Sequence, residues 1–128
     1  MKEQTELSVL LVDDELEFAS TLAARLKIRG YSATVVPDGE SALACIGEIR
    51  FDIVVLDVML PGMHGIEVLQ RIKALRAELP VILLTGQAGA KDGIEGMKQG
   101  ALAYLSKPVD LNELLELFHS VNKGSGHA

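Results

Sequence analysis

The sequence predicts a single α/β domain built on a parallel five-stranded sheet with five helices. Three observations favour this fold class. Near-continuous apolar runs of strand length, such as residues 9–12 and 53–56, are typical of strands buried on both faces of a helix-covered sheet. Segments with helical spacing alternate with these runs, so the chain divides into five strand–helix units. The length of 128 residues suits one domain that buries its own core.

The first two units follow from apolar spacing and turn residues. A strand is expected at 7–12 and a helix at 15–29, which Gly30 ends. This helix has an apolar face at i, i+4, i+8 spacing, made of Phe18, Leu22 and Leu26. The second strand is expected at 32–36, and a turn at 37–39 leads into a short helix with the apolar residues Ala42, Leu43 and Ile46.

The third unit and the fourth strand are the most strongly apolar part of the chain. Strands are expected at 52–57 and 80–85, and Pro80 suits the first position of a strand because it lacks an N–H. Between them, after a turn at 61–62, a helix presents one apolar face, made of Ile66, Leu69 and Ile72.

The fourth helix, expected at 89–99, is the weak one. Gly93 and Gly96 each cost about 1 kcal/mol relative to alanine in a helix interior. The fifth strand is expected to end at Lys107, and Asp110 is expected to cap the last helix. The apolar face of that helix consists of Leu111, Leu114, Leu115 and Phe118.

These elements predict one domain with two short flanking segments. We expect residues 1–6 to be an N-terminal extension, residues 7–121 to be the domain, and residues 122–128 to be a flexible tail or linker stub. The first and third strands are the most uniformly apolar, which indicates a central position and is compatible with the strand order 2-1-3-4-5.

Composition and charge exclude several classes of protein. The longest apolar stretches are far shorter than a membrane span. The net charge of −6 and the lack of a Lys/Arg cluster argue against direct binding of nucleic acid or of an anionic membrane. Residues 1–6 lack the apolar core of a secretory signal, and the single cysteine, Cys45, fits a reducing compartment. We therefore expect a cytoplasmic protein.

Polar residues stand at the ends of four expected strands. Asp13 and Asp14 follow the first strand, Asp57 ends the third, Thr85 ends the fourth, and Lys107 ends the fifth. Because functional groups gather at the carboxyl edge of such sheets, we expect these side chains to lie together. Carboxylates suit Mg²⁺, which keeps waters that a phosphate can displace. A hydroxyl and an ammonium can bind phosphoryl oxygens.

Each of these residues also has an ordinary structural interpretation. Asp13 and Asp14 could cap the first helix, and for this segment alone we rank capping ahead of metal binding by roughly two to one. Asp57 could be a simple strand-end residue, Lys107 could serve only as an ion-pair partner, and Thr85 could bond its own turn. The complete set, with each member at a strand end, favours a joint site for a metal and a phosphoryl group.

Four segments, within about residues 7–121, resemble the receiver domain of two-component response regulators, including chemotaxis regulators. They are Leu11-Val12-Asp13-Asp14-Glu15, Leu56-Asp57-Val58-Met59-Leu60-Pro61-Gly62, Leu83-Leu84-Thr85-Gly86 and Tyr104-Leu105-Ser106-Lys107-Pro108. The resemblance implies a flavodoxin-like, doubly wound fold with strand order 2-1-3-4-5. This agrees with the interpretation of the apolar pattern.

The resemblance implies Mg²⁺-dependent phosphorylation of an aspartate. Asp57 would accept a phosphoryl group from a phosphohistidine on a sensor histidine kinase or a histidine phosphotransfer protein. Asp14 and Asp57 would bind Mg²⁺, or Mn²⁺, together with the backbone carbonyl of Met59 and a water held by Asp13. Such a chain is a signalling module that catalyses its own phosphorylation and dephosphorylation, and it is not otherwise an enzyme.

The resemblance also implies a switch. Lys107 and Thr85 would contact the phosphoryl oxygens, and Tyr104 stands where the family keeps its switch aromatic. We expect the fourth helix, fifth strand and fifth helix to form the output face, which signals to a downstream protein or a fused output domain. The chain would be a monomer or a weak, phosphorylation-dependent homodimer. Met59 and Gln87 would tune the lifetime of the phosphoryl group, which we expect to be minutes or longer.

Other classes remain as alternatives. A magnesium-dependent hydrolase of the haloacid-dehalogenase type would need a second aspartate where this chain has Met59, and a cap domain that the chain lacks. A flavin- or nucleotide-binding module would need a glycine-rich loop after the first strand, where residues 13–15 are acidic. A receiver fold that acts as a phosphorylation-independent binding module also stays open.

Overall fold

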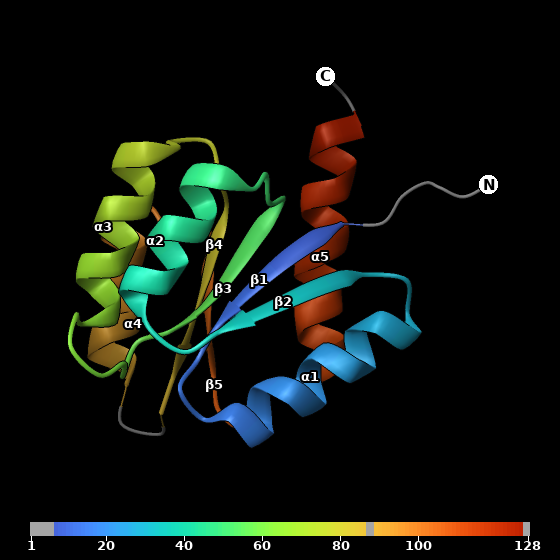
Figure 1. Cartoon of the computed structure of the whole chain (residues 1–128), viewed down its shortest axis with the longest axis horizontal. Coiled ribbons are helices and arrows are strands. Elements are labelled where there is room, and N and C mark those ends of the chain that lie inside the picture. Colours follow the sequence, from blue (N-terminus) through green and yellow to red (C-terminus); the bar gives the residue numbers. More distant parts are fainter. Residues whose placement is uncertain (1–6, 87–88, 127–128) are drawn as a thin grey trace.

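The computed structural model describes residues 7–86 and 89–126, with side-chain environments as far as Val121. The described residues form a parallel five-stranded sheet flanked by five helices, as the sequence predicts (Figure 1). The elements, in chain order, are β1 (Ser8–Val12), α1 (Leu16–Ile28), β2 (Ser32–Val36), α2 (Gly39–Glu48), β3 (Ile53–Asp57), α3 (Gly65–Leu75), β4 (Val81–Thr85), α4 (Ala90–Lys98), β5 (Ala103–Ser106) and α5 (Leu111–Gly126).

The strands lie in the order β2-β1-β3-β4-β5, and every neighbouring pair is parallel. This is the predicted order of a flavodoxin-like doubly wound sheet. It places β1 and β3 side by side at the centre, so that the residues that end them meet at the middle of the carboxyl edge. Every residue of β3 and β4 is buried, whereas the edge strands β2 and β5 are mostly half-buried or exposed.

Two apolar layers hold the helices on the sheet. On one face, α2 and α3 pack against alternate strand residues such as Leu10 and Leu56. On the other face, α1 and α5 pack against their neighbours in the strands, such as Leu11 and Val55. Successive side chains of a strand point to opposite faces, so one apolar run serves both layers. Figure 1 shows α2, α3 and α4 on one side of the sheet and α1 and α5 on the other.

The fifth strand ends at Ser106, one residue before its predicted end at Lys107. It begins at Ala103, because Gly100 has a φ of 104° and the N–H of Ala101 bonds back to the carbonyl of Gly96 at the end of α4. The two residues before β5 therefore belong to the turn that leaves α4. The peptide bond between Lys107 and Pro108, directly after the strand, is cis.

The last helix is longer than predicted. We expected a flexible tail or linker stub from residue 122, but the backbone of α5 stays helical as far as Gly126. Extending an existing helix needs no new nucleus, so glycines near its end do not stop it at once. Its start agrees with the prediction, because the Asp110 carboxylate accepts the N–H of Asn112 at 2.9 Å. Within the described ranges, neither α5 nor any other helix is long and apolar enough to cross a membrane.

Candidate functional site

The fold gathers the predicted site residues at the carboxyl edge of the sheet. Asp57 is the last residue of β3 and Thr85 the last of β4, while Asp13 and Lys107 directly follow β1 and β5. Three of them are buried although they are polar: Asp13 is 2% exposed, Asp57 5% and Thr85 1%. Buried polar side chains that meet at a strand edge are unusual in a structural core and indicate a functional site.

The three aspartates lie close enough to share one cation. One carboxylate oxygen of each of Asp13, Asp14 and Asp57 lies within 4.8 Å of the others. Local turns use one oxygen of two of these carboxylates. Asp13 Oδ1 accepts the N–H of Glu15 at 2.9 Å, and Asp57 Oδ1 accepts the N–H of Met59 at 3.1 Å. The second oxygen of each of these two carboxylates is directed into the site. The Asp13 bond closes a turn ahead of α1 and is not a helix cap, because the N-cap residue is Glu15, whose side chain makes no capping hydrogen bond.

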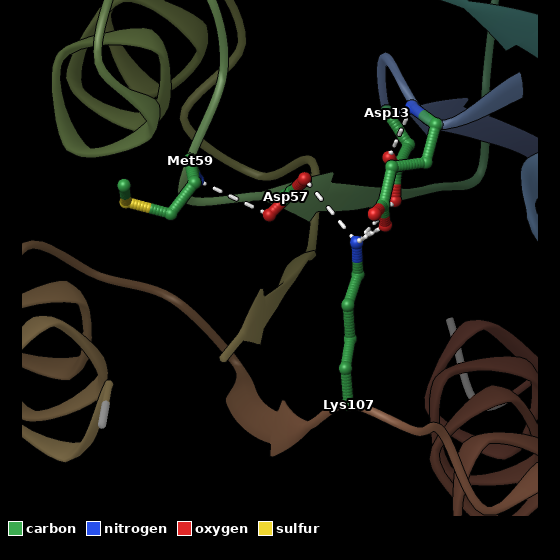
Figure 2. A network of polar contacts seen from close by, with 5 residues as sticks. Asp13, Asp57, Met59 and Lys107 are labelled. Atoms are coloured by element: carbon green, nitrogen blue, oxygen red, sulfur yellow. Dashed lines mark hydrogen bonds and ion pairs between the residues drawn. The ribbon is translucent and has the colours of Figure 1, made fainter. Parts of the chain in front are cut away.

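Lys107 reaches into this group of acids (Figure 2). Its ammonium lies 3.0 Å from Asp13 Oδ2, 3.3 Å from Asp57 Oδ2 and 2.7 Å from Glu15 Oε1. It also lies 4.7 Å from the centre of the Phe18 ring. Burial acts to lower the pKa of Lys107, but hydrogen bonds to Glu15 and Asp13 and the charge of Asp57 outweigh it and raise the pKa above its ordinary value. The side chain is therefore a fixed cation.

The acids at the site are electrostatically unbalanced. Burial raises the pKa of Asp57 above its ordinary value, and the charge of Asp13 adds to this, against the Met59 N–H and Lys107. Asp13 Oδ2 is also buried, and its one cationic partner among the described residues is Lys107, which it shares with Asp57 and Glu15. A small divalent cation would relieve both problems, because it accepts several carboxylate oxygens. The residues present therefore fit a magnesium site.

Thr85 has a buried hydroxyl without a hydrogen-bond partner among the described residues. The alternative that this hydroxyl bonds its own turn is therefore not seen. A cavity of about 210 Å³ adjoins it and is lined by Val58, Met59, Thr85, Gly86, Gly89 and Asp92. An unpaired hydroxyl beside open space can donate to an incoming oxyanion.

The remaining predicted residues lie outside the acidic group. Met59 places its backbone N–H on Asp57, while its side chain is 67% exposed. Tyr104 is half-buried on β5 and packs against the core layer that contains α3. Gln87 lies outside the described residues, so its predicted part in tuning is not located.

Sequence reasoning missed Glu15 and Phe18. Glu15 makes the shortest ion contact of Lys107, yet the two residues are 92 positions apart in the chain. The sequence pattern marks Glu15 only as the expected start of the first helix and Phe18 only as part of its apolar face. The one available signal was their place in the sequence: Glu15 directly follows the two aspartates, and Phe18 lies one turn further on, in the first turn of α1.

The fold and the site define a doubly wound α/β domain with an acidic, lysine-bridged centre at the carboxyl edge of its sheet. The model of one family, the response regulator receiver domain, matches residues 9–119. The chain belongs to this family and is a receiver domain of the kind found in two-component systems.

Individual proteins agree with this assignment. The chain is 41% identical over 119 residues to the sensory transduction protein RegX3 of Mycobacterium tuberculosis strain H37Rv, covering 93% of this chain and 52% of that protein. It spans about half the length of the curated relatives that it matches. Two solved structures are also similar: a Francisella response regulator receiver domain (TM-score 0.86, 31% identity, 94% and 99% of the two chains) and a CheY-like receiver domain from Methanospirillum hungatei (TM-score 0.88, 27% identity, 97% and 100%).

Proposed function

We propose that the chain is a phosphorylation-dependent switch in which Asp57 accepts a phosphoryl group. The donor is a phosphohistidine on a sensor histidine kinase or a histidine phosphotransfer protein. One observation carries the proposal: the buried Asp57 carboxylate lies 3.3 Å from Lys107 and close to the oxygens of Asp13 and Asp14. In the reaction, an Asp57 oxygen forms a bond to phosphorus while the bond from phosphorus to the imidazole nitrogen breaks.

In this proposal, Asp14 and Asp57 hold Mg²⁺ or Mn²⁺ directly, with the backbone carbonyl of Met59 and a water held by Asp13. The bound cation offsets negative charge on the phosphoryl oxygens. The Lys107 ammonium does the same from the β5 side, and its raised pKa keeps it charged at neutral pH. Thr85 donates its hydroxyl, which has no hydrogen-bond partner among the described residues, to a phosphoryl oxygen.

The output is a change in the face made of α4, β5 and α5. Tyr104 on β5 acts as the switch residue, and the signal passes to a downstream protein or a fused output domain. RegX3 is named a sensory transduction protein, and another relative, from Bacillus subtilis, is named a transcriptional regulatory protein. We expect the switch to be cytoplasmic and a monomer or a weak, phosphorylation-dependent homodimer. Residues 7–121 form the receiver unit, and Met59 and Gln87 tune the phosphoryl lifetime.

The test is intact-mass spectrometry after addition of acetyl phosphate, with Mg²⁺ or with a chelator. A single phosphoryl adduct that needs Mg²⁺ and is absent in Asp57→Asn is the expected result. Asp110→Asn is a matched control, because asparagine caps a helix as well as aspartate does and the change lies outside the site. An adduct retained in Asp57→Asn would contradict the proposal.

Two outcomes would favour the alternatives. Steady turnover of acetyl phosphate, with no adduct that outlasts it, would indicate a magnesium-dependent aspartyl-phosphate hydrolase. If neither acetyl phosphate nor a phosphorylated histidine donor gave an adduct, the chain would be a binding module that works without phosphorylation. The decay time of the adduct, measured after removal of the donor, tests the predicted lifetime of minutes or longer.

A further inference from the structure

The side of α4 that faces the sheet carries glycine where it meets Tyr104. Gly93, in the middle of α4, is buried. A Cβ atom at this position would lie 2.5 Å from Cγ and 2.6 Å from Cε2 of the Tyr104 ring, closer than real Cβ atoms approach other atoms. The helix backbone therefore lies directly on the ring. With the ring in this place, only glycine fits at position 93.

Gly89, one turn earlier, makes the same kind of contact with Thr85. A Cβ atom at Gly89 would lie 2.5 Å from Cβ and 3.1 Å from Oγ1 of Thr85. Residues four apart lie on one side of a helix, so the start of α4 touches Thr85 on β4 and Tyr104 on β5 with bare backbone. Gly47 of α2 differs, because a Cβ atom there would meet nothing within 4 Å.

We propose that Gly93 is the positioning residue of Tyr104, and that the α4 backbone couples Thr85 to Tyr104 through Gly89 and Gly93. The coupling rests on the proposed function, in which Thr85 binds the phosphoryl group. The cavity of about 210 Å³ beside Thr85 and Gly89 gives the start of α4 room to move. When Thr85 turns toward the phosphoryl group, its contact with Gly89 changes, α4 shifts, and Gly93 transmits the shift to the ring.

Tyr104 can be observed alone, because the chain has two tyrosines and no tryptophan. Tyr31→Phe keeps the ring that packs edge-on against Phe118 and leaves Tyr104 as the single tyrosine. In this background, fluorine NMR of protein labelled with fluorotyrosine reports Tyr104 only. We expect Gly93→Ala to shift this resonance in the unphosphorylated protein and to lower the thermal midpoint. The matched control, Gly47→Ala, should leave the resonance in place and should not lower the midpoint.

A double variant tests the contact itself. In Tyr104→Ala the ring is absent, so alanine at position 93 has space and is the better helix former. Gly93→Ala should then raise the thermal midpoint, the opposite of its effect when the ring is present. An unchanged fluorine resonance in Gly93→Ala would overturn the proposal. An equal loss of midpoint with and without the Tyr104 ring would also overturn it.

The proposed coupling of Thr85 to Tyr104 is tested by a separate measurement on the phosphorylated protein. With acetyl phosphate and Mg²⁺, the Tyr104 resonance of the starting protein should shift, and Gly93→Ala should lose this shift although its phosphoryl adduct still forms. An adduct with the full shift in Gly93→Ala would refute the coupling. If neither acetyl phosphate nor a phosphorylated histidine donor gave an adduct in either protein, the proposed function would be refuted instead. The measurements on the unphosphorylated protein would still decide whether Gly93 positions Tyr104.

Discussion

The centre of the sheet and its β5 edge are built in different ways. β3 is paired on both sides, by β1 and β4, and all its residues are buried as far as Asp57. Among the described strands, β5 pairs with β4 alone. Its residues are half-buried or exposed, and the helix that covers it contains two glycines. The acidic centre thus stands on the most constrained strand. The candidate switch residue stands on the least constrained one, where local rearrangement costs least.

The largest expected difference concerns side-chain truncation in these two regions. Leu56 of β3 is fully buried, so Leu56→Ala should lower the free energy of unfolding by about 2–5 kcal/mol. Ile94 of α4 is 53% exposed, so Ile94→Ala should change it by no more than about 0.5 kcal/mol. Urea unfolding of both variants measures the contrast. An equally large loss in Ile94→Ala would show that the outer face of α4 is held as tightly as β3.

Glycine substitutions in the helices are expected to have a smaller and more informative effect. A Cβ atom at Gly96 of α4 would clash with Leu83 on β4, so Gly96→Ala should lower the free energy of unfolding by about 1–3 kcal/mol. At Gly47 of α2 the space is open, and Gly47→Ala should raise it by up to about 1 kcal/mol. The same unfolding assay checks both signs. Stabilisation by Gly96→Ala would mean that α4 can move away from β4 at no cost.

Much of the fold was predictable because its causes are local. Apolar runs such as 53–56 identify central strands, and turn residues such as Gly30 mark where helices stop. The continuation of α5 to Gly126 was not predicted, because local glycines say little about how far a formed helix continues. The contacts of Gly93 and Gly96 with the sheet were also beyond prediction. The sequence shows these glycines as weak helix formers, and only the packing shows why no larger residue fits.

The residues of the site that stand at strand ends could be predicted from the sequence, but the contacts that balance their charges could not. Asp13, Asp57 and Lys107 follow from the rule that the carboxyl ends of parallel strands share one edge. The ion pair of Lys107 with Glu15 depends on how two loops approach each other, and no spacing in the sequence encodes that. That the Thr85 hydroxyl is buried without a partner in the described part of the chain is likewise a property of three-dimensional packing.

The pH dependence of the free energy of unfolding tests whether burial of the Asp57 carboxylate destabilises the folded protein. The unfolded chain ionises Asp57 near its ordinary pKa of 3.8, but burial raises the pKa in the folded protein. Between these two values the folded state holds more protons, so stability falls as pH rises through the window. With a chelator present, Asp57→Asn should therefore be more stable than the starting protein at pH 7. This advantage should disappear below the unfolded pKa.

Thermal unfolding at a series of pH values measures this difference. Asp110→Asn serves as the control, since Asp110 is exposed and caps α5. If Asp57→Asn were no more stable at neutral pH, Lys107 would already balance the Asp57 charge. The carboxylate would then need no cation for electrostatic relief.

The smallest expected effect belongs to Glu15, although it makes the shortest ion contact of Lys107, at 2.7 Å. The Glu15 side chain is 63% exposed, so water screens the pair, whereas Asp13 and Asp57 hold the same ammonium from buried positions. Glu15→Gln should therefore change the rate of phosphoryl adduct formation by no more than a few-fold. Glu17→Gln, which removes the same charge in the first turn of α1, is the matched control. If Glu15→Gln slowed the reaction as severely as Lys107→Ala, the position of the lysine would depend on the solvent-facing start of α1 rather than on the buried centre of the sheet.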